Sequence, residues 1–140
     1  EMKKSDSVRT PDRILQLVRE EFGECYDPCP LNPEFDPTIH QDGLADDFEW
    51  GQVSFVNPPY SNVKPWFRKA REQWKKGKTI VILCKLSNLG TQYAKLYTPG
   101  SEKRVLTRKV KFDGYDHAAL FSNVFVIFRA GSTSNKLTFI

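Results

Sequence analysis

Four consecutive residues, Asn57-Pro58-Pro59-Tyr60, have the clearest chemical potential in the sequence, because they end an apolar, β-branched run with an amide, two rigid rings and a phenol. A planar amine such as the exocyclic amino group of adenine is a poor nucleophile, since its lone pair is delocalised into the ring. Two hydrogen-bond acceptors on its protons would bias the nitrogen toward tetrahedral geometry. The side-chain oxygen of Asn57 and the carbonyl of Pro58 suit these roles, because the Pro-Pro pair holds the backbone extended. Tyr60 is then predicted to stack on a base turned out of its helix.

Such an amine needs no proton-abstracting base when the methyl donor is the sulfonium of S-adenosylmethionine, which is a strong electrophile. Positioning the two reactants can supply much of the acceleration. The alternative for the same four residues is a plain turn without a catalytic role.

Helices and strands alternate around this motif. Thr10 is predicted to cap a helix with Pro11 at its first position, and the apolar stripe of DRILQLVREEF extends the helix to Gly23. Further helices are expected at 63–78 and 89–97, and strands at 24–28, 52–56, 79–84, 104–107, 109–112 and 123–128. This order predicts an α/β fold, a mixed sheet with flanking helices.

The chain of 140 residues is expected to form one domain, with 1–7 and 131–140 flexible or peripheral. No segment approaches the ~20 apolar residues that cross a bilayer, and the first residues do not resemble a secretion signal. We therefore expect a protein of the cytoplasm, that of a host cell if the source is viral, and associated with the nucleoid. The three cysteines and the spacing of the acidic residues indicate neither disulfides nor a metal site.

Ligands of open α/β sheets bind beyond the carboxyl ends of the strands. Two candidate segments follow predicted strands in this way, Asp27-Pro28 and Asn57 to Tyr60. The long segment 29–47, with its prolines and an Asp42-Gly43 pair, is expected to be an ordered, irregular loop, and a simple Asp-Gly turn is the alternative reading of that pair.

Several segments recur together in a recognisable order: TP, a strand ending in DP, QDGL followed by Trp50, VSFVNPPYS, PWFRKA, TIVILC, KVKF and FSNVFVIF. Over roughly residues 8–129 they resemble the phage-type DNA N-6-adenine methyltransferases, the Dam family. The resemblance implies a shortened Rossmann-like, S-adenosylmethionine-dependent methyltransferase domain with Asn57, Pro58, Pro59 and Tyr60 as catalytic motif. It also implies cofactor contacts: Thr10, Pro11, Asp27 and Pro28 with the methionine part, and Asp42 with the adenosine part.

The formal charge of +4 suits a polyanionic partner, and the bases concentrate in the second half of the chain. Adenine-containing DNA is the expected partner; no membrane is expected, and a second subunit of a homo-oligomer is a further source of sequence-reading contacts. The candidate substrate-binding residues are Ser61, Trp66, Lys69, Lys75 and Lys76. The simpler readings are a core role for the tryptophan and a solvated helix face for the lysines.

Two alternatives remain open at this level. An RNA adenine or a protein glutamine amide would need the same two acceptors. The other alternative is a non-catalytic nucleic-acid-binding module that keeps the pocket but does not bind the cofactor. It stays open because the sequence has DPCPLNP where many methyltransferases have a glycine-rich, cofactor-binding turn.

Overall fold

The computed structural model describes residues 9–30, 42–112 and 121–140, and its centre is a five-stranded mixed sheet in the order β1-β2-β4-β3-β5. The strands are β1 (Val53–Val56), β2 (Thr79–Lys85), β3 (Glu102–Leu106), β4 (Asn123–Phe128) and β5 (Leu137–Phe139). The β1–β2 and β3–β5 pairs are parallel, and β4 is antiparallel to both of its neighbours. The predicted α/β class with a mixed sheet is confirmed.

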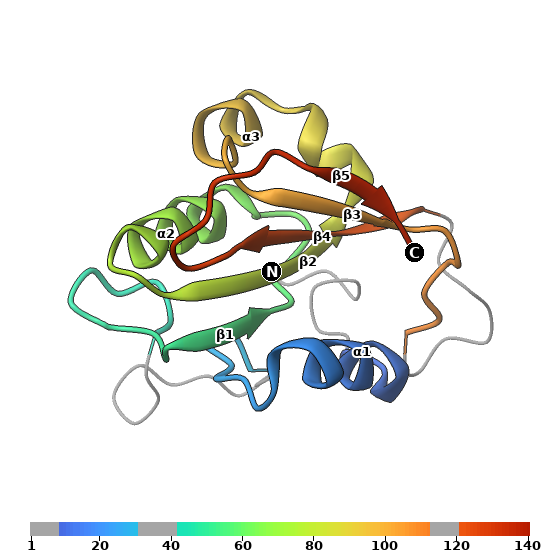
Figure 1. Cartoon of the computed structure of the whole chain (residues 1–140), viewed down its shortest axis with the longest axis horizontal. Coiled ribbons are helices and arrows are strands. Elements are labelled where there is room, and N and C mark those ends of the chain that lie inside the picture. The colour runs from blue at the N-terminus through green and yellow to red at the C-terminus, as the bar shows by residue number, and fades with distance from the viewer. Residues whose placement is uncertain (1–8, 31–41, 113–120) are drawn as a thin grey trace.

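Helices cover both faces of the sheet (Figure 1). On one face lies α1 (Asp12–Phe22), and on the other lie α2 (Lys64–Lys75) and α3 (Gln92–Tyr97), the latter preceded by the 3₁₀ helix η2 (Leu86–Gly90). The strands β2 and β4 are apolar on both faces because each face packs against a helix. No helix within the described ranges has the length and apolar character to cross a membrane.

Two predicted strands are wrong. The segment 24–28 forms only an isolated parallel bridge, Tyr26 with Ser54, because the following prolines have no N–H to continue a ladder. The segment 109–112 is not a strand, since β4 and β5 already occupy both sides of β3. Its side chains Val110 and Phe112 pack instead into the core beneath α1.

The start of α1 also differs from the prediction. Pro11, not Thr10, occupies the N-cap position, and its carbonyl accepts from the backbone nitrogens of Ile14 and Leu15. Thr10 is thereby left outside the helix, with its hydroxyl available for a partner on another element.

The sequence predicts that residues 1–7 and 131–140, the two ends of the chain, are flexible or peripheral. Residues 1–7 lie outside the described residues. The stretch 131–140 ends in β5, which is an edge strand hydrogen-bonded along β3, a strand that the sequence reading did not include.

Candidate active site at the carboxyl edge of the sheet

Asn57 directly follows β1, whose carboxyl end lies at the same edge of the sheet as the end of β2. Lys85 closes β2 and pairs with Asn123, the first residue of the antiparallel β4. The ends of β1 and β2 and the start of β4 therefore lie at one edge of the sheet, which we call the carboxyl edge (Figure 1). Open α/β sheets bind their ligands at this position.

The Asn57 amide is oriented by a residue far away in sequence. Its Nδ2 donates a hydrogen bond of 2.9 Å to Oγ1 of Thr10, the residue just before α1. The side-chain oxygen is the acceptor of the amide, and the bond to Thr10 restrains its orientation. The structure thus brings together two predicted site residues that are 47 positions apart.

The two prolines carry the chain away from the sheet in a rigid, extended form. Pro58 is buried, and the following turn uses the carbonyl of Pro59, which accepts from the backbone nitrogen of Asn62 at 3.0 Å. The turn does not use the carbonyl of Pro58. Ser61, the next predicted contact, is exposed beyond the motif.

Tyr60 lies in an aromatic cluster on the α1 face of the sheet. Its ring meets Phe112 and Phe121 edge to face, with centroids 6.1 and 5.8 Å away. Its hydroxyl accepts a hydrogen bond of 3.1 Å from Nδ2 of Asn123. Burial raises the pKa of this phenol above its ordinary value, so it stays protonated.

Lys85 is a residue of this edge that the sequence reading did not single out. Its Nζ lies 4.5 Å from the ring centre of Phe121 and 6.0 Å from that of Tyr60, which places a cation on the aromatic cluster. The available signal was a base at the end of the buried run TIVILCK, beside the motif-bearing strand.

The two predicted acidic cofactor residues lie close to one another. The carboxylate of Asp27 accepts from the backbone nitrogen of Cys29, and that of Asp42 accepts from Leu44, each at 2.9 Å. Burial, followed by the charges of Asp27 and Asp42, raises the pKa of the Cys29 thiol to about 12. Both carboxylates are therefore near the same thiol.

Gly43 explains how these segments meet. A side chain at this position would collide with the carbonyl oxygen of Pro28 and press on the ring of Trp66. The Asp42-Gly43 turn and the Asp27-Pro28 segment consequently form one tight contact, for which only glycine is small enough.

Asp27 is exposed at the surface, although its carboxyl group is partly desolvated by the surrounding residues. Desolvation raises its pKa above the ordinary value of 3.8, and the hydrogen bond from Cys29 opposes this shift only in part. A cationic or hydroxyl-bearing ligand at this position would relieve the cost.

Trp66 has a supporting position in the core. It is almost completely buried and stacks on Trp50 at 6.1 Å, and the Trp50 indole nitrogen donates to the carbonyl of Gly43 at 2.8 Å. The pair thus holds the Asp42-Gly43 turn from beneath, which matches the core alternative for Trp66.

The predicted basic face of α2 is not a common surface. Lys69 is only 4% exposed, and its Nζ donates to the carbonyl of Ala45 at 2.8 Å, which favours a structural role over the predicted phosphate contact. Lys76 is exposed but forms an ion pair of 2.7 Å with Glu49. Lys75 is exposed, and it lies with Lys76 at the end of a helix of 12 residues, about 18 Å from its start beside the motif.

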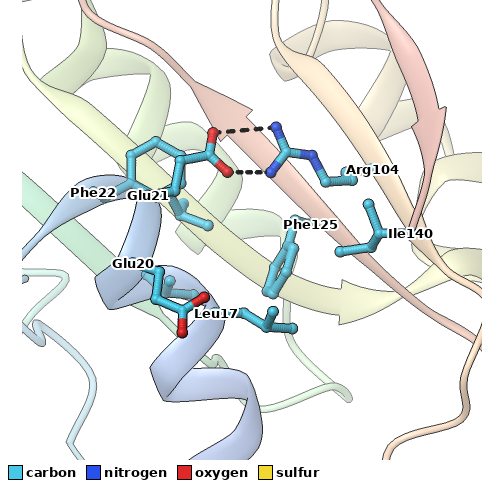
Figure 2. Close-up of a pocket in the computed structure, with 9 residues that line it drawn as sticks. Leu17, Glu20, Glu21, Phe22, Arg104, Phe125 and Ile140 are labelled. Atoms are coloured by element: carbon cyan, nitrogen blue, oxygen red, sulfur yellow. Dashed lines mark hydrogen bonds and ion pairs between the residues drawn. The ribbon is translucent and has the colours of Figure 1, made fainter.

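A cavity of about 470 Å³ lies elsewhere, between the second half of α1 and the sheet (Figure 2). Leu17, Phe125 and Ile140 provide apolar walls, and at its rim the Glu21 carboxylate pairs with Arg104. None of the residues that line it belongs to the predicted site. Glu21 and Arg104 are paired with each other, whereas the Glu20 carboxylate accepts a hydrogen bond from Gln16 and can accept further ones.

Comparison with known proteins gives one match. A family model described as DNA N-6-adenine-methyltransferase (Dam) matches residues 1–98, which include every predicted site residue and end just after α3. No curated protein and no solved structure matches the chain.

Proposed function

This chain belongs to the DNA N-6-adenine-methyltransferase (Dam) family, and on that basis we propose that it transfers the methyl group of S-adenosylmethionine to the exocyclic amino nitrogen of adenine in DNA. The observation that carries the proposal is the Asn57 side chain, whose nitrogen is held by Thr10 at the carboxyl edge. Its oxygen is thereby fixed as an acceptor at the place where ligands of such sheets bind.

In the proposed reaction, the side-chain oxygen of Asn57 and the carbonyl of Pro58 each accept one proton of the adenine amino group. These two bonds draw the nitrogen out of conjugation and direct its lone pair toward the methyl carbon. S-adenosylmethionine, when bound, supplies an electrophilic methyl group. A nitrogen–carbon bond forms as the sulfur–carbon bond breaks, S-adenosylhomocysteine leaves, and the extra proton on nitrogen passes to water. Holding the groups in line supplies much of the rate.

Cofactor binding is proposed for the joined segments around Asp27 and Asp42. Their chemistry fits the cofactor, because a desolvated carboxylate such as Asp27 gains from an ammonium group and a second carboxylate can accept from ribose hydroxyls. The backbone at Pro28 and Gly43 forms a tight turn in place of a glycine-rich loop. We propose that this packed turn takes over the cofactor-binding role of that loop.

The adenine base is proposed to stack on the cluster of Tyr60, Phe112 and Phe121, which offers aromatic surface directly after the two acceptors. The Lys85 ammonium on the same cluster is the cation best placed for a phosphate of the flipped nucleotide. We propose Lys85 in place of Lys69 as a contact to the DNA backbone.

The strand arrangement supports a shortened Rossmann-like domain. The Tyr26 bridge lies on the free side of β1 and is parallel to it, so the Asp27 segment ends at the same edge as Asn57. The cofactor and base sites are then neighbours across β1, as in-line transfer requires.

The test is methyl transfer from labelled S-adenosylmethionine to double-stranded DNA, single-stranded DNA and RNA, followed by digestion to nucleosides. Cofactor binding is measured by calorimetry on the same protein. The proposal predicts label in N6-methyladenine of DNA. Binding of the cofactor with label in RNA alone, or in no adenine, would overturn the assignment of DNA adenine as substrate. Absence of cofactor binding would favour a non-catalytic nucleic-acid-binding module.

A further inference from the structure

Asn123 is an unusual residue for its position. It begins β4, whose other residues are all apolar, and it is 0% exposed. A buried amide is costly unless its hydrogen-bonding groups are satisfied, so an asparagine at such a place calls for a specific role. The family match ends at residue 98, so the match assigns no role to Asn123.

Its contacts point to Tyr60. Nδ2 of Asn123 donates to the Tyr60 hydroxyl and to the Cys84 carbonyl, each at 3.1 Å. The Oδ1 atom is buried without a partner among the described residues. The Asn123 amide therefore joins the end of β2, the start of β4 and the motif tyrosine. It makes these bonds although its own Oδ1 atom has no partner among the described residues.

The ring contacts of Tyr60 do not supply the same directional restraint. Edge-to-face packing against Phe112 and Phe121 tolerates tilts of the ring, as aromatic pairs generally do. The hydrogen bond from Asn123 fixes the far end of the phenol. With Thr10 holding Asn57, each end of the motif is then held by a polar side chain from another element.

We propose that Asn123 is a positioning residue for methyl transfer, which holds Tyr60 by its hydroxyl so that the ring presents a fixed face to the flipped adenine. The inference rests on the proposed function. Its effect on the reaction passes through Tyr60, so loss of the Asn123 amide and loss of the Tyr60 hydroxyl are expected to be equivalent.

The experiment is a double-mutant cycle with Asn123→Leu, which keeps the side-chain size, and Tyr60→Phe, which keeps the ring. For each variant, kcat and KM for methyl transfer to unmethylated DNA are measured, together with calorimetric binding of S-adenosylmethionine. Each single change is expected to lower kcat about 3- to 10-fold, the range for loss of one hydrogen bond, with cofactor affinity unchanged. The double variant is expected to be no slower than the slower single variant.

The control is a second asparagine–tyrosine pair on the opposite face, where Nδ2 of Asn88 donates to the Tyr93 hydroxyl at 3.0 Å. Tyr93→Phe is expected to leave kcat at the native value.

Multiplying effects in the double variant would overturn the inference, because Asn123 would then act independently of Tyr60. A native kcat for Tyr60→Phe would overturn it as well, and this result stands even if Asn123→Leu does not fold. No methyl transfer by the native chain would instead overturn the proposed function, and this inference with it.

Discussion

The two edges of the sheet use polar side chains in opposite ways. At the carboxyl edge, Asn57 and Tyr60 each have one hydrogen-bond partner from another element and are followed by a rigid or aromatic surface. At the opposite, amino edge, Glu49, Gln73 and Lys78 are bonded to one another and to the backbone of Trp50.

The difference shows that charge in the sequence does not equal charge available to a ligand. The amino edge holds Lys75, Lys76 and Lys78, of which Lys76 and Lys78 both pair with Glu49. The carboxyl edge has fewer charges, but its Asn57 and Tyr60 side chains are each held in position by a hydrogen bond. Binding and chemistry are expected at the carboxyl edge, and stability is expected to depend on the amino edge.

The largest expected effect tests the structural role of the amino edge. Gln73 is 1% exposed, and its Oε1 accepts from the Trp50 backbone nitrogen and the Lys78 ammonium at 3.0 and 2.6 Å. Gln73→Met keeps the volume but leaves the buried Trp50 nitrogen without its acceptor and removes one of three acceptors from Lys78, so the free energy of unfolding should fall by about 2–3 kcal/mol. Urea unfolding measures this loss.

Lys75→Met, a change at an exposed position in the same helix, is the matched control and should leave the midpoint unchanged. Equal stability of the Gln73→Met variant and the native chain would contradict the expectation that the stability of the fold depends on the amino edge.

Thr10→Val tests the orientation of Asn57 at the other edge. Valine has the shape of threonine without the hydroxyl that accepts from Asn57, so the amide is free to rotate. The rate of methyl transfer should fall about 5-fold, as expected for loss of one hydrogen bond of about 1 kcal/mol. Thr10→Ser keeps the hydroxyl and should keep most of the activity; equal losses in both variants would indicate that the methyl group, and not the hydroxyl, is required.

The salt dependence of DNA binding distinguishes the edges as DNA contacts. Lys85→Gln should reduce the slope of log affinity against log salt by about 0.9, the value for one phosphate contact. Lys75→Gln, about 18 Å along α2, should not change the slope. The reverse outcome would place the DNA on the far end of α2.

The smallest effect is a pH dependence of opposite sign at the two edges. Hydrogen bonds from Lys76, then from Gln73 and Lys78, lower the pKa of Glu49 from 4.5 to about 2. Its contribution to stability is therefore present above pH 4.5 and is lost as the pH falls toward 2. The raised pKa of Asp27 acts the other way, since its contribution is present below pH 3.8 and is lost as the pH rises through the folded-state pKa.

At pH 7, Glu49→Gln should thus lower the melting temperature, and Asp27→Asn, which can still accept from Cys29, should raise it slightly. Thermal melts from pH 2.5 to 7 measure both changes. Shifts of the same sign at pH 7 would contradict the contrast between the edges.

The sequence was sufficient for the parts of the fold with local signals. Periodicity predicted α1, α2 and the buried strands, and the prolines after VSFV predicted where the chain leaves the sheet. The family was recognisable from the same motifs. The contact between Asn57 and Thr10 was not predictable, because Thr10 has the features of a helix cap and its actual partner is 47 residues away.

Long-range pairing also explains the other errors. Nothing local distinguishes KVKF from a strand, but β4 and β5 already occupy both sides of β3, the strand that precedes it. The burial of Lys69 depends on the carbonyl of Ala45, which a loop brings to α2. Asn123 reads as the first residue of a strand until the fold places Tyr60 beside it.

The most direct test of the central claim, that the carboxyl edge performs methyl transfer through Asn57, is a single-turnover assay with saturating S-adenosylmethionine and unmethylated DNA. Asn57→Ala and Gln73→Met are compared with the native chain at a temperature at which all three are folded. For Asn57→Ala, the expected rate is at least roughly 100-fold below that of the native chain, with unchanged cofactor affinity. For Gln73→Met, the expected rate is that of the native chain. A native rate for Asn57→Ala would contradict the account, as would equal losses in both variants.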